Sequence, residues 1–239
     1  MSKLKEIVTD TIAVVEQMKR DGITHAEVSR QTLDELGQPP RVAPVAPPVA
    51  SLELLALEKE ALACKKCREL ADGRTNVVFG VGNPHAELMF VGEAPGRDED
   101  LEGEPFVGRA GELLTKIIQA MGFARHEVYI ANVLKCRPPE NRVPLPDEVT
   151  NCRPYLLKQI EIIKPKVIVV LGATAMKALL AVEVPISKMR GNWYTFHDIP
   201  LMPTFHPAYL LYNPPSKKEV WQDMQAVVTK LGREIPKTK

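Results

Sequence analysis

The stretch GEAPGRDEDLEGEPFVGRAG, residues 92–111, brings glycines and carboxylates together in one short segment. Five of its twenty residues are glycine and six are acidic. Glycines let a backbone approach a flat ligand closely, and carboxylates can take up a proton or stabilise a cation. We therefore regard the segment as a candidate binding loop. Its acidic residues are Glu93, Asp98, Glu99, Asp100, Glu102 and Glu104.

Part of this segment, GEPFVGRA (103–110), is close to a phosphate-binding loop, which requires G-x4-G-K-[ST]. Arg109 stands in place of the lysine, and Ala110 in place of the hydroxyl that binds Mg²⁺. These departures argue against a nucleoside triphosphate and favour a neutral ligand held by backbone amides. Phe106 in the same loop could stack on a flat ring. Taken by itself, it is better interpreted as an ordinary phenylalanine of the hydrophobic core.

Two polar residues stand at the ends of apolar runs. The amide of Asn132, in VYIANVLKC, offers a donor and an acceptor together, as reading one edge of a nucleobase requires. Taken alone, Asn132 is equally in keeping with a turn or a helix cap. His206 lies in PTFHPAYLL at the end of a weaker run, where a lone histidine is more often structural.

The four cysteines have a spacing that favours a metal centre. Cys64 and Cys67 form a C-x2-C pair, Cys136 lies 69 positions after Cys67, and Cys152 lies sixteen after that. A disulfide framework is not expected in a reducing compartment. Four thiolates can hold Zn²⁺ or an iron–sulfur cluster, and the spacing leaves both open. The alternative is four small buried side chains. Basic neighbours could offset the thiolate charge or face a phosphate backbone: Lys65, Lys66, Arg68, Lys135, Arg137 and Arg153.

Strands and helices alternate along the main part of the chain. Buried strands that alternate with helices predict an α/β fold, a three-layer α/β/α sandwich around a mostly parallel four-stranded sheet. Ligands of such sheets bind beyond the carboxyl ends of the strands, here near Gly92, Asn132, Gly172 and His206. The predicted strands are 87–93, 128–133, 166–172 and 200–207, and the predicted helices are 109–121, 147–163 and 173–181.

The N-terminal part differs in composition. Residues 1–37 carry apolar residues at helical spacing and are predicted to form a helical extension. Residues 38–50 hold five prolines in thirteen positions, which predicts an extended linker. The main domain is predicted to span 51–239. A net charge of +1 selects no partner, no apolar run is long enough for a membrane span, and no signal peptide is evident, so we expect a cytoplasmic protein without membrane contact.

Taken together, the motifs resemble the family 4 uracil-DNA glycosylases, the iron–sulfur type of bacteria and archaea. The resemblance covers residues 52–232. It is carried by the four cysteines and by four segments in a fixed order: GEAPGRDED (92–100), EPFVGRAG (104–111), NVLKCRPP (132–139) and HPAYLL (206–211).

The resemblance implies a DNA repair enzyme that flips uracil out of DNA, hydrolyses its N-glycosidic bond and leaves an abasic site. The cysteines Cys64, Cys67, Cys136 and Cys152 would hold a [4Fe-4S] cluster, His206 would stabilise the departing base, and Asn132 would read its edge. The best-known uracil-DNA glycosylases have a water-activating aspartate at the position where this chain has Ala94. Glu93 and Glu99 are therefore the candidates for activating the water here. The uracil pocket implied by the resemblance consists of Gly92, Glu93, Ala94, Phe106, Asn132 and His206.

The substrate implied is uracil-containing DNA, double- or single-stranded. We expect a monomer, and a protein partner recruited through residues 1–50 is a further hypothesis. A non-catalytic DNA-binding module stabilised by a metal cluster remains the alternative, as do a zinc-stapled nucleotidase and a covalent uracil-trapping relative. The trapping relative needs a histidine in an inserted loop just after GRAG, and the segment ELLTKIIQAMG (112–122) that follows GRAG here contains none. The residues expected to contact DNA are Arg109, Tyr209, Leu210, Leu211, Lys217 and Lys218.

Overall fold

The structure is a computed structural model that describes residues 16–22 and 49–236. The chain divides into two compact units, Met1–Ala46 and Pro47–Lys239. In the first unit, residues 16–20 are helical and 21–22 form a turn. The rest of the predicted helical extension and nearly all of the predicted linker lie outside the described residues. Among those described, no helix has the combined length and apolar character needed to cross a membrane.

The second unit is built on one six-stranded sheet in the order β1-β3-β2-β4-β6-β5. The four central strands run parallel, and the two edge strands are antiparallel to their neighbours. The mostly parallel sheet is confirmed, with six strands rather than the four predicted. The strands are β1 (Val81–Gly82), β2 (Leu88–Gly92), β3 (Tyr129–Asn132), β4 (Val167–Leu171), β5 (Tyr194–Phe196) and β6 (Ile199–Thr204).

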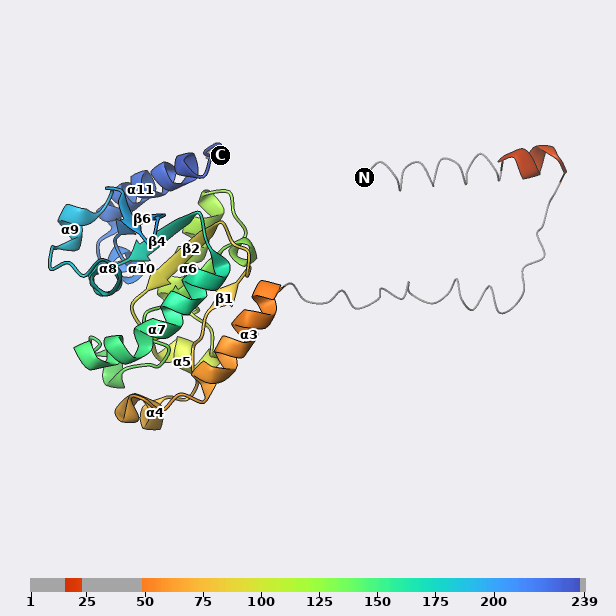
Figure 1. The fold of residues 1–239 in the computed structure, drawn as a ribbon. Coiled ribbons are helices and arrows are strands. Elements are labelled where there is room, and N and C mark those ends of the chain that lie inside the picture. The colour runs from red at the N-terminus through yellow and green to blue at the C-terminus, as the bar shows by residue number, and fades with distance from the viewer. Residues whose placement is uncertain (1–15, 23–48, 237–239) are drawn as a thin grey trace. The chain divides into compact units, whose positions relative to one another are not determined.

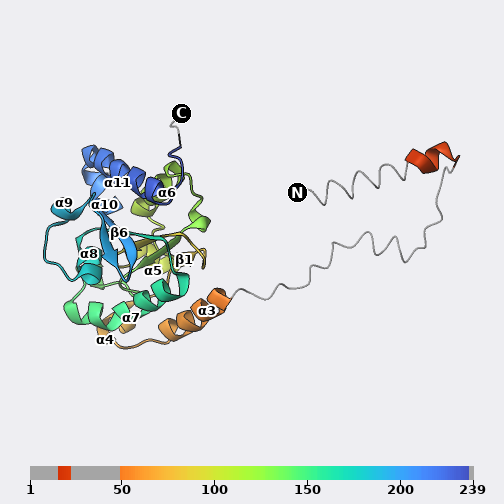
Figure 2. The same cartoon turned by 45° about the horizontal axis from the view of Figure 1, so that its top comes forward.

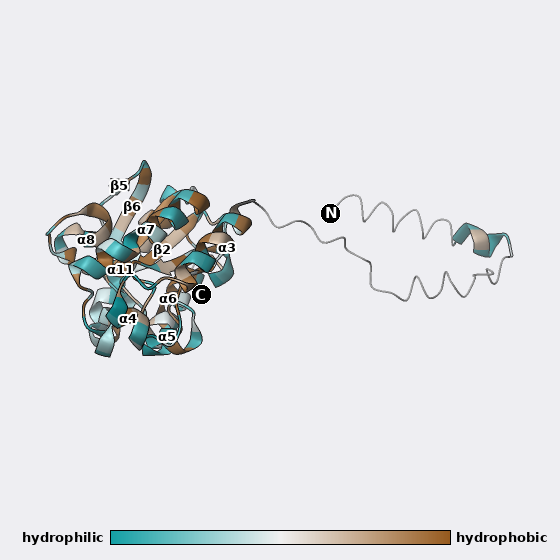
Figure 3. Ribbon diagram, turned by 60° about the horizontal axis from the view of Figure 1, so that its bottom comes forward, coloured by the Kyte–Doolittle hydropathy of each residue, from teal (hydrophilic) through white to brown (hydrophobic). Residues whose placement is uncertain are grey.

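Helices cover both faces of the sheet, so the three layers are confirmed. Figure 2 shows α6, α10 and α11 on one side and α3, α7 and α8 on the other. The alternation of side chains along β2 explains the arrangement, because Leu88 and Phe90 pack in the core under α6 and α11, while Met89 and Val91 pack under α7 and α8. All five residues of β2 are buried, as expected for a parallel sheet covered on both faces. The ribbon of β2 is accordingly on the hydrophobic side of the colour scale in Figure 3.

The strongly periodic helices lie where the sequence places them. Predicted helix 109–121 is α6 (Arg109–Ala120), 147–163 is α7 (Pro146–Ile163), and 173–181 is α8 (Ala173–Leu180). Figure 1 shows α3 and α7 along one face of the sheet. The remaining helices are α3 (Val49–Leu62), α4 (Arg68–Gly73), α5 (Arg97–Glu102), α9 (Ile186–Met189), α10 (Pro207–Tyr212), α11 (Lys217–Lys230) and the 3-10 turns η1 (Arg125–Glu127), η2 (Pro139–Asn141) and η3 (Pro214–Ser216).

Two parts of the sheet domain differ from expectation. The segment after His206, for which no helix was predicted, is helical in α10, and residues from Lys217 onward form α11. The apolar side of α11 explains this, because Val220, Met224 and Val227 pack against the sheet. The edge strands β1 and β5 have two and three residues, too few to leave an alternating pattern in the sequence.

Candidate active site

The residues that end or follow β2, β3 and β6 meet around one cavity of about 340 Å³, here called the strand-end cavity, whereas the end of β4 at Gly172 does not line it. Because β2, β3, β4 and β6 are parallel, the residues that end or follow them lie at the same edge of the sheet. The cavity is lined by residues that the sequence singled out, Glu93, Ala94, Glu99, Phe106, Asn132 and His206, and by Pro95, Gly96, Ala110, Pro138, Asn141, Arg142 and Ala208.

Gly92, the last residue of β2, lets two side chains of the cavity approach each other. A Cβ built at this position would overlap the side-chain oxygen of Asn132 and come within 2.6 Å of the Phe106 ring. Any side chain at residue 92 would therefore displace both. The backbone after Gly92 stays fixed because Val133 and Leu134 donate hydrogen bonds to the carbonyls of Gly92 and Glu93 at 2.9 and 3.0 Å.

Asn132 presents an unpaired acceptor. The residue is only 2% exposed, and its side-chain oxygen Oδ1 has no hydrogen-bond partner among the residues that the structure describes. An unpaired buried acceptor costs free energy unless a ligand satisfies it. The side chain is thus poised to take a hydrogen bond from a bound molecule.

A buried polar chain holds Asn132 from behind. The ammonium of Lys135 donates to the backbone carbonyl of Asn132 at 2.8 Å and to Oε1 of Gln159 at 2.6 Å. Gln159 donates in turn to the Phe79 carbonyl and to the Tyr129 hydroxyl. Burial lowers the pKa of Lys135 to about 7, a shift that the sulfurs of Cys152 and Cys136 oppose. Lys135 was not singled out for this role from the sequence.

His206 follows β6 and is held in one tautomer. Its Nδ1 accepts a hydrogen bond from the backbone N–H of Ala208 at 3.1 Å, so the proton of the neutral ring is on Nε2. Burial lowers the pKa of His206 to about 4, although part of the residue remains exposed. The ring lies 5.5 Å from that of Phe106, with a 30° angle between their planes. At neutral pH the site therefore has an uncharged histidine that donates through Nε2.

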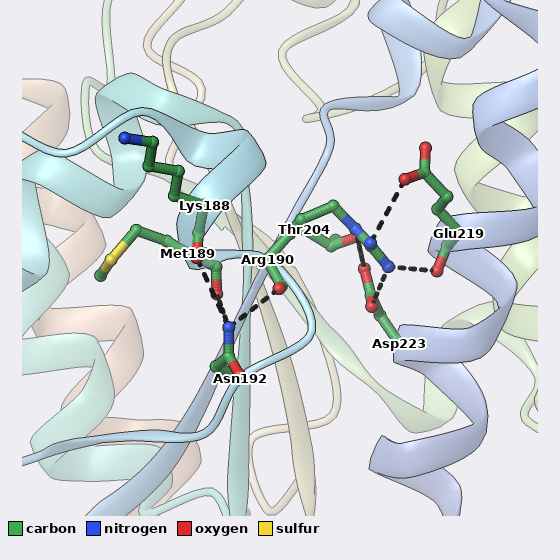
Figure 4. Close-up of polar contacts among 7 residues, drawn as sticks. All are labelled: Lys188, Met189, Arg190, Asn192, Thr204, Glu219 and Asp223. Atoms are coloured by element: carbon green, nitrogen blue, oxygen red, sulfur yellow. Dashed lines mark hydrogen bonds and ion pairs between the residues drawn. The ribbon is translucent and has the colours of Figure 1, made fainter.

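The end of β6 is itself anchored to α11, as Figure 4 shows. Thr204, two residues before His206, donates to Oδ2 of buried Asp223 at 2.6 Å. The guanidinium of Arg190 pairs with the same carboxylate and donates to the Glu219 carbonyl at 2.7 Å. Burial raises the pKa of Asp223, while Thr204 and Arg190 oppose the shift. This network fixes the strand end from which His206 projects.

The two candidate carboxylates have different surroundings. Glu99 accepts from the backbone N–H of Gly96 at 3.0 Å through one oxygen, and from those of Val107 and Gly108 at 3.1 and 3.3 Å through the other. Both of its oxygens thus hold the glycine loop in shape. Within the described part of the chain, the Glu93 carboxylate has no hydrogen-bond or ion-pair partner, although Glu93 also lines the strand-end cavity.

The rest of the acidic row divides into one buried residue and an exposed group. Asp100 is 2% exposed and accepts from the backbone N–H groups of Thr75 and Asn76, so it fixes the loop before β1. Asp98, Glu102 and Glu104 are exposed. Asp100 therefore has a structural role that the other three carboxylates of this group do not share.

Sequence reasoning missed the wall formed by the η2 segment. Arg142 lines the strand-end cavity and forms a two-point ion pair with Glu148, at 2.7 and 2.9 Å, and a further one with Glu69 at 2.9 Å. Asn141 has a positive φ of 56° in the same turn. The only available signal was position, because the segment directly follows the strand that ends in Asn132.

Most residues expected to contact DNA are at the surface. Arg109, Tyr209, Lys217 and Lys218 are exposed, and Leu211 is half-buried. Leu210 is an exception and a correction, because it is 1% exposed in the core with α6 and α11 and cannot insert into a base stack. Tyr212, not considered from the sequence, is 82% exposed on the same helix.

The four cysteines line a second, much smaller cavity of about 20 Å³, here called the cysteine cavity. Cys64 follows α3, Cys67 immediately precedes α4, Cys136 follows β3, and Cys152 lies in α7. Segments far apart in the sequence are thus brought together. Among the described residues, no three His, Cys, Asp or Glu side chains are arranged to hold a single metal ion.

Hydrogen-bond donors point at three of these sulfurs. Arg74 donates to Cys136 Sγ at 3.0 Å, the backbone N–H of Lys135 to Cys152 Sγ at 3.1 Å, and Asn151 to Cys67 Sγ at 3.7 Å. Burial raises the pKa of the Cys67 and Cys136 thiols and raises that of Cys152 to about 11. Such donors stabilise sulfur ligands that carry negative charge, and four soft sulfur donors suit zinc or an iron–sulfur cluster.

Comparisons with known proteins decide the family. A profile of the Uracil DNA glycosylase superfamily matches residues 79–225. The chain is 45% identical over 186 residues to a type-4 uracil-DNA glycosylase of Archaeoglobus fulgidus, covering 74% of this chain and 93% of the relative. It is 50% identical over 167 residues to that of Thermotoga maritima, covering 67% and 85%. The chain belongs to the type-4 uracil-DNA glycosylases.

Membership of the type-4 uracil-DNA glycosylases confirms the resemblance and gives the strand-end cavity its context. A type-4 enzyme of Sulfurisphaera tokodaii is 48% identical over 180 residues, with 72% of this chain and 81% of the relative covered. The match to the superfamily begins at Phe79, just before β1, and ends at Gln225 in α11. It therefore includes every strand of the sheet and every residue that lines the strand-end cavity.

Proposed function

We propose that this type-4 uracil-DNA glycosylase flips uracil out of DNA, binds it in the strand-end cavity and hydrolyses its N-glycosidic bond. One observation carries the proposal. The side chain of Asn132, with its unpaired oxygen, and the neutral His206 ring line the same cavity as the Phe106 ring. Gly92 lies beside them, where any side chain would overlap Asn132 and Phe106. A flat base with a donor on one edge and an acceptor oxygen on another complements this arrangement.

Recognition of uracil follows from Asn132 and Phe106. The side chain of Asn132 can accept from uracil N3–H and donate to O4, while Phe106 stacks on the ring. Cytosine offers the opposite pattern, an acceptor at N3 and a donor at N4, so it would leave the buried amide unpaired. A buried polar group left without a partner costs about 1–3 kcal/mol, which favours uracil over cytosine. Extruding the base costs a few kcal/mol, and less where uracil is mispaired.

Cleavage depends on His206. As the N-glycosidic bond breaks, positive charge develops on the sugar and negative charge on uracil O2. The Nε2–H of the neutral ring can donate a hydrogen bond to that oxygen in a site already organised for it. The hydrogen bond from Ala208 to Nδ1 and the anchoring of β6 fix the direction of this donor. The uracil anion leaves, and water adds to the sugar carbon with loss of a proton.

Glu93 is the better of the two candidates for assisting that water or the cationic sugar. Its carboxylate is unpaired among the described residues, whereas three backbone N–H groups occupy Glu99. We therefore assign Glu99 to maintaining the loop. A cationic sugar reacts even with a weak nucleophile, so the contribution of Glu93 is expected to be modest.

The DNA is proposed to pass over the mouth of the strand-end cavity. Arg109 and Tyr209 are neighbours of Ala110 and Ala208, which line that cavity. Tyr209 and Leu211 remain candidates for the wedge that replaces the extruded base, while Arg109, Lys217 and Lys218 would meet phosphates. Uracil in double- or single-stranded DNA is the proposed substrate.

The cysteine cavity is proposed to hold a [4Fe-4S] cluster through Cys64, Cys67, Cys136 and Cys152. Its support is the donor set, four soft sulfurs around one cavity with hydrogen bonds directed at three of them. Four protein ligands would leave no open position, so the cluster would stabilise the fold. We further propose that the enzyme works as a cytoplasmic monomer and that residues 1–50 recruit a protein partner.

The test is release of free uracil from a uracil-containing oligonucleotide in EDTA, with the visible spectrum of the protein recorded beforehand. We expect uracil release together with brown absorbance, and no release from a matched oligonucleotide with thymine. A colourless protein that binds the oligonucleotide without cutting it would favour the DNA-binding module instead. Activity that EDTA abolishes would favour a zinc enzyme.

A further inference from the structure

Phe106 has a backbone conformation that its own side chain does not favour. Its φ is +57°, in the left-handed region, where a bulky residue is strained and stays only if its surroundings hold it there. The residue is nonetheless 6% exposed, with its ring facing Gly92 and His206. Some contact outside the strand-end cavity must keep this conformation.

Arg125 supplies that contact from the 3-10 turn η1. Its Nη2 donates to the carbonyl of Pro105 at 2.7 Å and to that of Phe106 at 3.1 Å. Its Nη1 donates to Oγ1 of Thr115 in α6 at 3.1 Å. The Thr115 hydroxyl donates in turn to the Gly111 carbonyl at 3.0 Å. One rigid guanidinium thus joins the carbonyls of the strained turn to the first turns of α6.

The close packing of α6 against Phe106 makes this fixation specific. A Cβ built at Gly111 would overlap the carbonyl of Phe106, so the helix lies directly against the strained peptide. With α6 on one side and Arg125 on the other, the carbonyl has one position, and the ring on the same residue has one orientation. Arg125 does not itself line the strand-end cavity.

We propose that Arg125 is a positioning residue that fixes Phe106 as a preformed stacking surface for uracil. This inference rests on the proposed function, because it requires that Phe106 stacks on the base. A rigid surface does not have to be ordered when the base arrives, so Arg125 would strengthen binding of uracil without touching it.

The experiment measures the inhibition constant of free uracil and the KM and kcat for a uracil-containing oligonucleotide. For Arg125→Met, which keeps the apolar stem, we expect the inhibition constant to rise about tenfold, within the range that base–aromatic stacking allows. Thr115→Val is the matched control. It removes the contact of Nη1 but leaves Nη2 on the two carbonyls, so its constants should stay within about twofold of wild type.

A double-mutant cycle separates positioning from general damage. In Phe106→Gly, which lacks the ring and adopts positive φ without strain, adding Arg125→Met should not weaken uracil binding further. Additive losses would overturn the proposal, as would an unchanged inhibition constant in Arg125→Met. Arg233→Met, which alters an arginine over the Phe123 ring away from the strand-end cavity, checks for nonspecific effects and should behave as wild type.

A variant that does not fold is replaced by a milder one. Arg125→Lys keeps a charge but cannot serve both carbonyls and Thr115 at once, so its inhibition constant should rise about threefold. A wild-type value in Arg125→Lys would overturn the proposal. Failure of the proposed function is distinguishable, because wild-type protein would then release no uracil, whereas failure of this inference leaves wild-type activity intact and the variants unaffected.

Discussion

The strand-end cavity takes its polar groups from the ends of parallel strands, whereas the cysteine cavity takes its thiols from loops and helices. Asn132 ends β3 and His206 follows β6, so the sheet itself sets their separation. Cys64 and Cys136 lie in irregular segments, with Cys67 before α4 and Cys152 inside α7. The positions of the polar groups in the strand-end cavity therefore follow from the sheet itself. The second joins segments that the sheet does not hold together.

The hydrogen bonds of the two cavities differ in the same way. In the strand-end cavity the functional atoms are left free, as with Oδ1 of Asn132, and other groups hold the backbone behind them. In the cysteine cavity the donors point at the sulfurs themselves. The first arrangement prepares a site for a ligand that comes and goes, and the second suits a resident ligand. Lys135 belongs to both, because its side chain holds Asn132 and its backbone N–H binds Cys152.

Asn132→Ala gives the largest expected effect and tests the first half of this comparison. Without the amide, the cavity loses the hydrogen bonds that are proposed to select uracil, and kcat/KM should fall at least about a hundredfold, the equivalent of about 3 kcal/mol. The measurement is kcat/KM on uracil- and cytosine-containing oligonucleotides, with visible spectrum and melting temperature as controls. Both controls should be unchanged, and near-wild-type activity would contradict the role of Asn132.

His206→Ala should reduce kcat about a hundredfold while KM changes little, because the hydrogen bond to O2 strengthens only as the bond breaks. A loss divided equally between kcat and KM would indicate that His206 positions the base instead.

The pH profile of the same residue sharpens this prediction. In the proposed mechanism the neutral ring is the active form, so kcat of the wild type should be constant above about pH 5 and fall as pH approaches 4, where His206 takes up a proton. Because the unfolded value, about 6.5, is higher, the unfolded state binds more protons between these values. The contribution of His206 to the free energy of unfolding is therefore fully present above about pH 6.5 and is lost as the pH falls toward 4. Absence of the acid limb in His206→Ala would support the assignment.

The sequence predicted the strand-end cavity well because its residues are tied to strand ends. The runs that become β2, β3 and β4 are apolar and contain β-branched residues, the run that becomes β6 is weaker, and the residues at their ends can be located in the sequence. The contacts that hold these strand-end residues in place could not be predicted from the sequence. Arg125 and Phe106 are nineteen residues apart, and Lys135 and Gln159 are twenty-four apart. Nothing in local periodicity relates such pairs, which meet only when helices pack on the sheet.

Leu210 illustrates the same limit from the opposite side. In HPAYLL, the run of apolar residues after His206 indicates an exposed wedge as readily as a buried helix, and proline at the start fits either. The structure places the segment in α10, where one face is buried and the other is exposed. Helical geometry then divides adjacent residues between core and surface, so Leu210 is buried while Tyr209 is 44% exposed.

Cys136→Ala has the smallest expected effect on the chemical step and tests the second half of the comparison. The substitution removes one sulfur and the acceptor of Arg74, which also donates to the Cys64 carbonyl. If the cysteine cavity binds a resident cluster that joins segments outside the sheet, the protein should lose its brown absorbance. It should also lose about 2–4 kcal/mol of unfolding free energy, or about 5–15 °C in melting temperature.

The activity of the surviving folded Cys136→Ala protein is the decisive measurement. Because Cys136 lies four residues beyond Asn132 and the sheet positions the strand end, kcat per folded molecule should fall by less than about tenfold, far less than in Asn132→Ala. A brown, fully stable variant would refute ligation by Cys136. A bleached variant as inactive as Asn132→Ala, although folded, would break the comparison, because the two cavities would then depend on each other through Lys135 and the loop that separates them.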